Sequence, residues 1–150
     1  MADLGITYER FAFIDLGSGK GRTLLMASDY PFLRIMGGEI IPELHAVALE
    51  NIARYRSDSQ KCFVLEAWLG DARKFPFPAE SMVVYLFNPF PADVLREVLE
   101  QLRASLEEYP RECYVIYHNL VHEDVFRTTV WLRQGRRTEQ YAIYRVVPST

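Results

Sequence analysis

A carboxylate and three glycines near the start of the chain form the strongest chemical signal in the sequence. Asp15 ends an apolar run, and Gly17, Gly19 and Gly21 follow it at every second position, with Ser18 inside the turn. A buried strand, a glycine turn and a helix in this order form a nucleotide-sized pocket at the carboxyl end of a strand in α/β proteins. The sequence therefore predicts a ligand site around this turn.

The glycine spacing argues against two phosphate-binding motifs. The dinucleotide fingerprint Gly-x-Gly-x-x-Gly needs a third glycine where this chain has Arg22. The Walker loop needs Ser or Thr after Gly-Lys, whereas Gly21 follows Lys20, and Ile14 stands where that motif has its first glycine. A carboxylate beside the turn repels phosphates and attracts an amino group or a sulfonium. Asp15 therefore favours a cationic ligand without a pyrophosphate.

The segment 15–21, Asp-Leu-Gly-Ser-Gly-Lys-Gly, resembles motif I of the class I S-adenosylmethionine-dependent methyltransferases. Its form is also similar to that of the non-SET histone-lysine methyltransferases and of small bacterial enzymes of unassigned substrate. The resemblance implies S-adenosylmethionine as the cofactor, and it implies cofactor contacts from a set of turn residues: Asp15, Gly17, Ser18, Gly19 and Gly21. The alternative is a glycine turn that serves only close packing of a strand against a helix.

Residues after the next two predicted strands fit the same family. Glu39 ends the second strand, where an acid accepts hydrogen bonds from ribose hydroxyls. The resemblance places Ile40 against the adenine, the Asp71 carboxylate on the adenine amino group, and the Ala72 backbone N–H on a ring nitrogen. The alternatives are a surface acid favoured by the dipole of the following helix for Glu39, and a helix N-cap or turn residue for Asp71.

Asn88, Pro89 and Phe90 follow the fourth predicted strand and are the candidate catalytic residues. They resemble the Asn-Pro-Pro-Tyr/Phe signature of amine-directed methyltransferases, shortened by one proline. The resemblance implies that Asn88, beside the cofactor, and a loop carbonyl hold the acceptor nitrogen while Phe90 packs against it. The alternative is a rigid loop with Phe90 in the core. His118 is either a general base, because imidazole titrates near neutrality, or a hydrogen-bonded structural residue.

The predicted elements alternate in an order that brings these residues to one edge of a sheet. We expect strands at 12–16, 33–39, 62–68, 82–87, 113–117, 129–133 and 140–147, and helices at 19–29, 42–55, 124–128 and from an Asp93 N-cap to before Pro110. The last of these helices has a core-facing stripe of Leu95, Val98, Leu99, Leu102 and Leu106. Gly37 and Gly38 indicate a close approach of backbone, and Gly135 is expected to turn the hairpin at 134–137.

Five β-α units followed by a hairpin match the topology of the methyltransferases that motif I resembles, and the resemblance implies a single methyltransferase domain over residues 1–150. Its fold is a Rossmann-like three-layer α/β/α sandwich with a mostly parallel seven-stranded sheet and a C-terminal antiparallel β-hairpin. Members of the family usually carry a helical segment before motif I that covers the cofactor. About ten residues precede the first predicted strand here, so we expect a short or absent N-terminal lid.

Composition and charge limit the kinds of binding partner that we expect for this protein. A net charge of −3 and a pI near 5.6 give no general attraction to nucleic acid, and Arg133, Arg136 and Arg137 are expected in a solvated turn. Cys62 and Cys113 are expected to be free core thiols in a reducing cytoplasm. The spacing of the histidines suggests no metal site. Without a signal peptide or a long apolar run, we expect a cytoplasmic protein without a membrane segment.

These observations predict an S-adenosylmethionine-dependent methyltransferase with an unidentified small-molecule or protein acceptor. The resemblance of residues 88–90 to the amine-directed signature implies that the acceptor atom is an amine nitrogen. The alternative is a non-catalytic S-adenosylmethionine-binding module or a subunit of a larger assembly. A nucleotide-binding oxidoreductase is disfavoured by Arg22 and by the predicted hairpin.

Overall fold

Strands and helices alternate along the part of the chain that the computed structural model describes, residues 4–87 and 90–147. The strands are β1 (Phe11–Leu16), β2 (Arg34–Glu39), β3 (Leu65–Leu69), β4 (Ser81–Phe87), β5 (Cys113–His118), β6 (Leu132–Arg137) and β7 (Tyr141–Val146). The α-helices are α1 (Arg22–Ala27), α2 (Pro42–Arg54), α3 (Ala92–Glu108) and α4 (Glu123–Arg127), and the short 3₁₀ helices are η2 (Tyr8–Arg10) and η3 (Ala72–Lys74).

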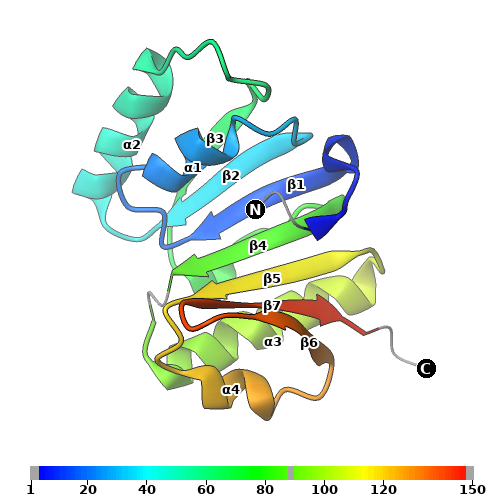
Figure 1. Cartoon of the computed structure of the whole chain (residues 1–150). Helices are drawn as coiled ribbons and strands as arrows, with labels where there is room; N and C mark the ends of the chain where they lie inside the picture. Colours follow the sequence, from blue (N-terminus) through cyan, green and yellow to red (C-terminus); the bar gives the residue numbers. More distant parts are fainter. Residues whose placement is uncertain (1–3, 88–89, 148–150) are drawn as a thin grey trace.

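The seven strands form one sheet in the order β3-β2-β1-β4-β5-β7-β6 (Figure 1). The first five strands pair in parallel, while β7 runs antiparallel to both β5 and β6. The predicted Rossmann-like sandwich with a C-terminal antiparallel hairpin is therefore confirmed. In this order the carboxyl ends of β1, β2, β4 and β5, after which the ligand candidates follow in the sequence, lie at one edge of the sheet.

Two clusters of apolar side chains hold the layers together on opposite faces of the sheet. On one face, Leu24 and Ala27 of α1 pack with Phe13 and Ile35, and Ile52 of α2 lies against the same cluster. On the other face, α3 and α4 cover the sheet (Figure 1). The predicted stripe of α3 is buried there at every position: Leu95, Val98, Leu99, Leu102 and Leu106.

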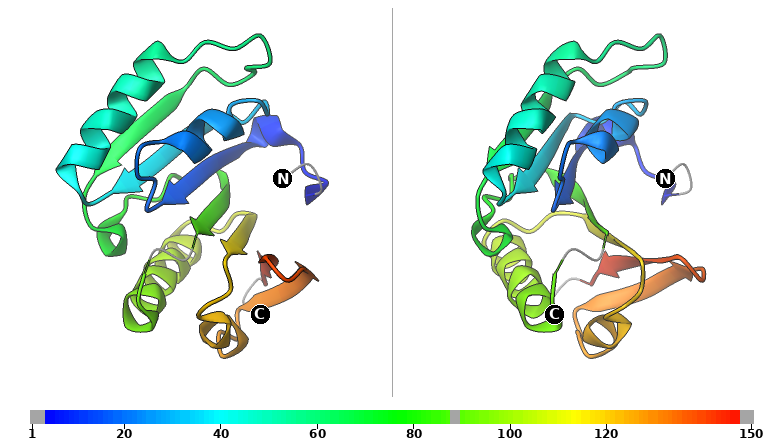
Figure 2. Two further views of the ribbon diagram at one scale, coloured as in Figure 1. Left: turned by 60° about the vertical axis from the view of Figure 1, so that its left-hand side comes forward. Right: turned by 90° about the vertical axis from the view of Figure 1, so that its left-hand side faces the viewer.

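The segment that precedes β1 lies on the same side of the sheet as α1 (Figure 2). Leu4, Ile6 and Tyr8 pack against the cluster beneath α1, and the Tyr8 ring stacks on Tyr30 at a centroid distance of 5.3 Å. None of the helices within residues 4–87 and 90–147 combines the length and the apolar character that a bilayer crossing needs.

The first helix is shorter than the sequence predicts. It begins at Arg22 and ends at Ala27, whereas the apolar pattern indicates residues 19–29. Gly19 and Gly21 have φ angles of +56° and +86°, which are incompatible with a right-handed helix. The glycines therefore extend the turn and delay the start of the helix.

The hairpin turns later than expected. Strand β6 continues through Arg137, and the turn uses Thr138, whose Oγ1 accepts hydrogen bonds from the N–H groups of Gln140 and Tyr141, each at 3.1 Å. Gly135 lies inside β6, where the register shifts between Gln134 and Arg137, and not in the turn. A hydroxyl that closes the turn replaces the glycine turn that the sequence suggests.

The basic residues expected in the hairpin turn lie in the strand instead. Arg133, Arg136 and Arg137 all belong to β6, and Arg137 forms an ion pair with Glu123 of α4. This pair connects the hairpin to the helix that follows β5.

Two further boundaries differ from expectation. Strand β3 begins at Leu65 and not at Cys62, because Lys61 and Cys62 first donate their backbone N–H groups to the Ser28 carbonyl. Helix α3 begins at Ala92 after an extended Pro91, so Asp93 lies in the first turn and is not the N-cap. Its charge still suits the positive end of the helix dipole.

Both cysteines are free and buried, as the sequence predicts. Burial raises the pKa of the Cys113 thiol to about 12.

Candidate functional site

The glycine turn after β1 is a left-handed loop attached to the neighbouring strand. Gly17, Gly19 and Gly21 all have positive φ, between +56° and +86°, which residues with a Cβ rarely adopt. The N–H groups of Gly17 and Ser18 both donate to the Gly38 carbonyl of β2, at 2.7 and 3.0 Å. The alternating spacing in the sequence therefore reflects a backbone shape that requires glycine.

The close approach predicted at Gly37 is confirmed. A Cβ atom added to Gly37 would lie 2.7 Å from both the Leu24 side chain and the Ser18 hydroxyl oxygen. At Gly38, an added Cβ would lie 3.1 Å from the Phe75 ring. The absence of a side chain at Gly37 therefore lets the turn and the start of α1 pack directly on β2.

Glu39 stands at the carboxyl end of β2, as predicted, and is buried. Its Oε1 accepts a hydrogen bond from the Gly19 N–H at 2.8 Å, and its Oε2 accepts one from the Ile41 N–H at 3.0 Å. The carboxylate thus links the glycine turn to the start of α2, a role that the sequence analysis missed. Each carboxylate oxygen has a second acceptor site, so the geometry also permits the predicted bonds to ribose hydroxyls.

Asp15 is 4% exposed and lies on the α1 face of the sheet. It is in register with Gly37 of β2 on one side and Tyr85 of β4 on the other. Burial, and then the nearby charge of Glu39, raise the pKa of Asp15 from its ordinary value of 3.8 to about 7. A buried carboxyl in this state ionises most readily when a cation arrives beside it.

Asp71 lies at the same edge of the sheet and binds Arg73, two residues further along the chain. Its Oδ1 accepts a hydrogen bond from the Arg73 N–H at 2.9 Å, so Asp71 caps η3, and its carboxylate pairs with the Arg73 guanidinium at 2.6 Å. The hydrogen bonds from Arg73 lower the pKa of Asp71 to about 2. The N-cap alternative is confirmed, and the adenine contact of Asp71 stays a prediction.

The remaining cofactor candidates differ in exposure. Ser18 is buried beneath the glycine turn, whereas Ile40 is 60% exposed and leaves an apolar surface beside Glu39. Ala72 begins η3 and packs against the core on the α3 side. The contacts of Ile40 and Ala72 with a cofactor stay predictions.

Of the three candidates after β4, Asn88 and Pro89 lie outside the described residues. Phe90 is half-buried and packs against the core on the α3 side. This packing agrees with the alternative in which Phe90 is a core residue, and the role of the loop in acceptor binding stays a prediction.

His118 ends β5, and the structure pairs it with Tyr85 of β4. The Tyr85 hydroxyl lies 2.8 Å from Nδ1 of His118, and the Phe87 ring meets the imidazole edge-to-face at 4.7 Å. This hydrogen bond agrees with the structural alternative for His118, and its role as a general base stays a prediction. Tyr85 comes two residues before the end of β4, which is the one sequence signal that it reaches this edge.

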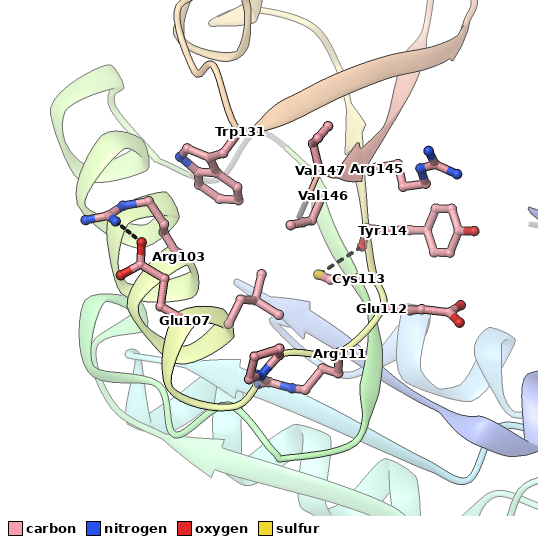
Figure 3. A pocket seen from close by; sticks show the side chains of 12 residues that line it. Arg103, Glu107, Arg111, Glu112, Cys113, Tyr114, Trp131, Arg145, Val146 and Val147 are labelled. Atoms are coloured by element: carbon pink, nitrogen blue, oxygen red, sulfur yellow. Dashed lines mark hydrogen bonds and ion pairs between the residues drawn. The ribbon is translucent and has the colours of Figure 1, made fainter. Parts of the chain in front are cut away.

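A cavity lies at the opposite, amino edge of the sheet, next to the start of β5 (Figure 3). It measures about 790 Å³ and is lined by residues that include Trp131, Arg145 and Arg111. The Arg111 guanidinium already has hydrogen-bond partners there, because it donates to the carbonyls of Pro78 and Tyr109, each at 2.6 Å. Ligands of open α/β sheets bind at the carboxyl ends of the strands, so we place the candidate site at the glycine turn.

No family model and no curated protein match this sequence. Solved structures do share its fold. An N-methyltransferase, NodS from Bradyrhizobium japonicum WM9 in complex with S-adenosyl-L-homocysteine, superposes with a TM-score of 0.67 at 11% identity, covering 90% of this chain and 77% of that one. The magnesium protoporphyrin IX methyltransferase ChlM from Synechocystis PCC 6803, with bound SAM, gives 0.63 at 12% identity, covering 91% and 69%.

An RNA methyltransferase from Salinibacter ruber in complex with S-adenosyl-L-homocysteine has a TM-score of 0.58 at 23% identity, covering 95% of this chain and 84% of that one. At sequence identities this low, the similarity to these structures shows a shared fold and nothing more. Together with the strand order and the antiparallel β7, it shows that this chain has the Rossmann-like fold of the methyltransferases.

Proposed function

We propose that the protein is an S-adenosylmethionine-dependent methyltransferase whose glycine turn corresponds to motif I. The observation that carries the proposal is the left-handed turn held to β2 by Glu39, directly beside the buried carboxyl of Asp15. The fold neighbours that were solved with SAM or S-adenosyl-L-homocysteine support the same cofactor.

The residues at this edge fit the chemistry of that cofactor. The Asp15 carboxyl suits an ammonium or sulfonium group, and the free acceptor sites of Glu39 suit two hydroxyls. Ile40, more than half exposed, offers an apolar surface to a planar base. When bound, the cofactor supplies an electrophilic methyl group.

The protein's own contribution to the reaction is alignment. The glycine turn and Glu39 hold the methyl donor at the carboxyl edge, and the loop with Asn88 holds an acceptor nitrogen in line with it. Positioning of this kind contributes roughly 7–11 kcal/mol to lowering a barrier in favourable cases.

Calorimetry tests the choice of ligand. We expect binding of S-adenosylmethionine and S-adenosyl-L-homocysteine, with much weaker binding of NAD and ATP. Glu39→Ala should weaken the cofactor by about 1.5–3 kcal/mol, the range for hydrogen bonds to a charged group, whereas Glu43→Ala, in the first turn of α2, should not. Tighter binding of NAD would refute the proposal.

A screen with methyl-labelled cofactor then separates an enzyme from a binding module. We expect transfer of the label to an amine, and Asn88→Ala should lower turnover while leaving S-adenosyl-L-homocysteine affinity unchanged. Cofactor binding without transfer to any amine, phenol, peptide or cell extract would favour the non-catalytic module.

A further inference from the structure

A second cavity opens on the α1 side of the sheet, at the carboxyl edge of β4 and β5. It measures about 240 Å³, and its lining includes Leu4, Tyr85, His118, Gln140 and Tyr141. Within residues 4–87 and 90–147, no helix crosses the front of β4, β5 and β7 (Figure 1). Among the described residues that line the cavity, Leu4 alone lies outside β4, β5, β7 and the turn before β7.

This cavity lies one strand away from the glycine turn. Tyr85 of β4 is in register with Asp15 of β1, and the charge of Asp15 contributes to raising the pKa of Tyr85, after the larger effect of burial. His118 and Tyr141 lie opposite each other in the pairing of β5 with β7. A molecule in the cavity would thus stand beside a cofactor held by the turn.

The lining selects the chemistry of its occupant. Among the residues that the structure describes, no Asp, Glu, Lys or Arg lines the cavity, and burial of an unpaired charge is costly. The rings of Tyr85, His118 and Tyr141 favour a flat partner, because aromatic pairs gain from edge-to-face and offset contacts. A cavity of roughly 150 Å³ accommodates a benzene ring, so the volume here suffices for one ring with a substituent.

We propose that this cavity is the acceptor subsite and that it takes an uncharged aromatic ring carrying an N–H nucleophile. The inference rests on the proposed methyl transfer and names its substrate class. His118 is the catalytic residue that receives the acceptor's proton, and Tyr85 is a positioning residue that holds the imidazole through the 2.8 Å contact with Nδ1.

With S-adenosylmethionine bound at the glycine turn, the nucleophile would form a bond to the methyl carbon through its lone pair. The bond between that carbon and the cofactor's sulfur would break, and its electrons would stay on the sulfur. When the Tyr85 hydroxyl accepts a hydrogen bond from Nδ1–H, the free Nε2 of His118 takes the N–H proton and passes it to solvent.

Ring binding is tested first, on the full chain saturated with S-adenosyl-L-homocysteine at pH 7.5. Aniline and cyclohexylamine form a matched pair of probes, because they have the same size but only aniline is flat and uncharged at that pH. Saturation-transfer NMR should show at least tenfold tighter binding of aniline, and phenol should compete with it. Equal or tighter binding of cyclohexylamine would overturn the inference.

Variants then test the two residues. His118→Ala should lower kcat for an aromatic acceptor about 100-fold, within the range for a general base, and added imidazole should restore part of it. Tyr85→Phe should lower kcat more than it raises KM. Tyr114→Phe is the matched control, since Tyr114 lies on the same sheet face nearer the opposite edge and contacts Phe11.

Affinity for S-adenosyl-L-homocysteine, measured on every variant, separates the possible failures. It should be unchanged in all three variants, which also shows that they are folded. If the wild-type protein does not bind this ligand, the proposed function fails, and this inference fails with it. If it binds and transfers methyl groups, but His118→Ala and Tyr85→Phe behave like Tyr114→Phe, this inference alone is wrong.

Discussion

Three acids at the carboxyl edge of the sheet occupy different environments, although the sequence analysis gave all of them a place in one cofactor site. Glu39 is held by two backbone N–H groups, Asp71 is neutralised by Arg73, and Asp15 is buried beside another acid. A carboxylate that already has partners shapes the site, while one without a counter-charge can accept a cation. Asp15 therefore has the most to gain from a positively charged ligand.

Asp15→Asn should make the free protein more stable at neutral pH. The pKa of Asp15 is raised to about 7 in the folded state, so between pH 4 and 7 the folded chain holds a proton that the unfolded chain has lost. The contribution of Asp15 to the free energy of unfolding is fully present below pH 4. It falls by about 1.4 kcal/mol per pH unit as the pH rises to 7. Between pH 5 and 7.5, the stability of the variant relative to wild type should increase by about 2–3 kcal/mol.

Urea denaturation at the two pH values measures this difference. Asp58→Asn is the control, because Asp58 is exposed in the loop before β3. A difference between Asp15→Asn and wild type that stays constant with pH would show that Asp15 titrates alike in the folded and unfolded chains.

At the scale of elements, the glycine turn, the start of α1 and β2 behave as one unit. The turn donates hydrogen bonds to the Gly38 carbonyl, and Gly37 leaves the space that Leu24 and Ser18 fill. The position of the turn is thus determined by a strand that follows it by about twenty residues in the chain.

Gly37→Ala should destabilise the protein and weaken cofactor binding together. The new methyl group would lie 2.7 Å from Leu24 and Ser18 and would force the turn away from β2. Such overpacking costs typically 1–3 kcal/mol. Gly135→Ala is the control, because its added Cβ would lie 3.5 Å from the nearest atom, the Ile143 carbonyl oxygen. Chemical denaturation and calorimetry with S-adenosyl-L-homocysteine measure both effects, and an unchanged affinity would show that the turn moves independently of β2.

At the scale of the whole molecule, stability and ligand binding are distributed differently. The core beneath α3 extends across β1, β4 and β5 to α4 and the hairpin. The glycine turn and Asp15 lie at the carboxyl edge of the sheet, beside α1 on the opposite face. Changes deep under α3 should therefore alter the free energy of unfolding without altering the site.

Leu102→Ala provides this test. Leu102 is 1% exposed, and truncation of a buried leucine typically costs 2–5 kcal/mol. We expect this loss in urea denaturation, with affinity for S-adenosyl-L-homocysteine unchanged at a temperature where the variant is folded. Met26→Ala, at a position 63% exposed, should change stability by less than about 0.5 kcal/mol. A large loss of affinity in Leu102→Ala would show that the core beneath α3 supports the site.

The sequence by itself determined the features that depend on near neighbours in the chain. The apolar runs of β1 and β4, the stripe of α3 and the left-handed glycine turn all follow from periodicity or from the absence of a Cβ atom. The alternation of these elements then specified the fold class, since parallel strands need helical crossovers.

Only the tertiary structure decided the contacts that join distant strands. The Glu39 bond to Gly19 and the Tyr85–His118 pair depend on which residues come into register when the sheet assembles. The start of β3 shifted for the same reason, because the distant Ser28 carbonyl accepts hydrogen bonds from Lys61 and Cys62. At the hairpin, two local turn signals competed, and the Thr138 hydroxyl rather than Gly135 closed the turn. Hydrogen bonds and packing across the sheet, rather than local propensity, determined how these side chains meet at its carboxyl edge.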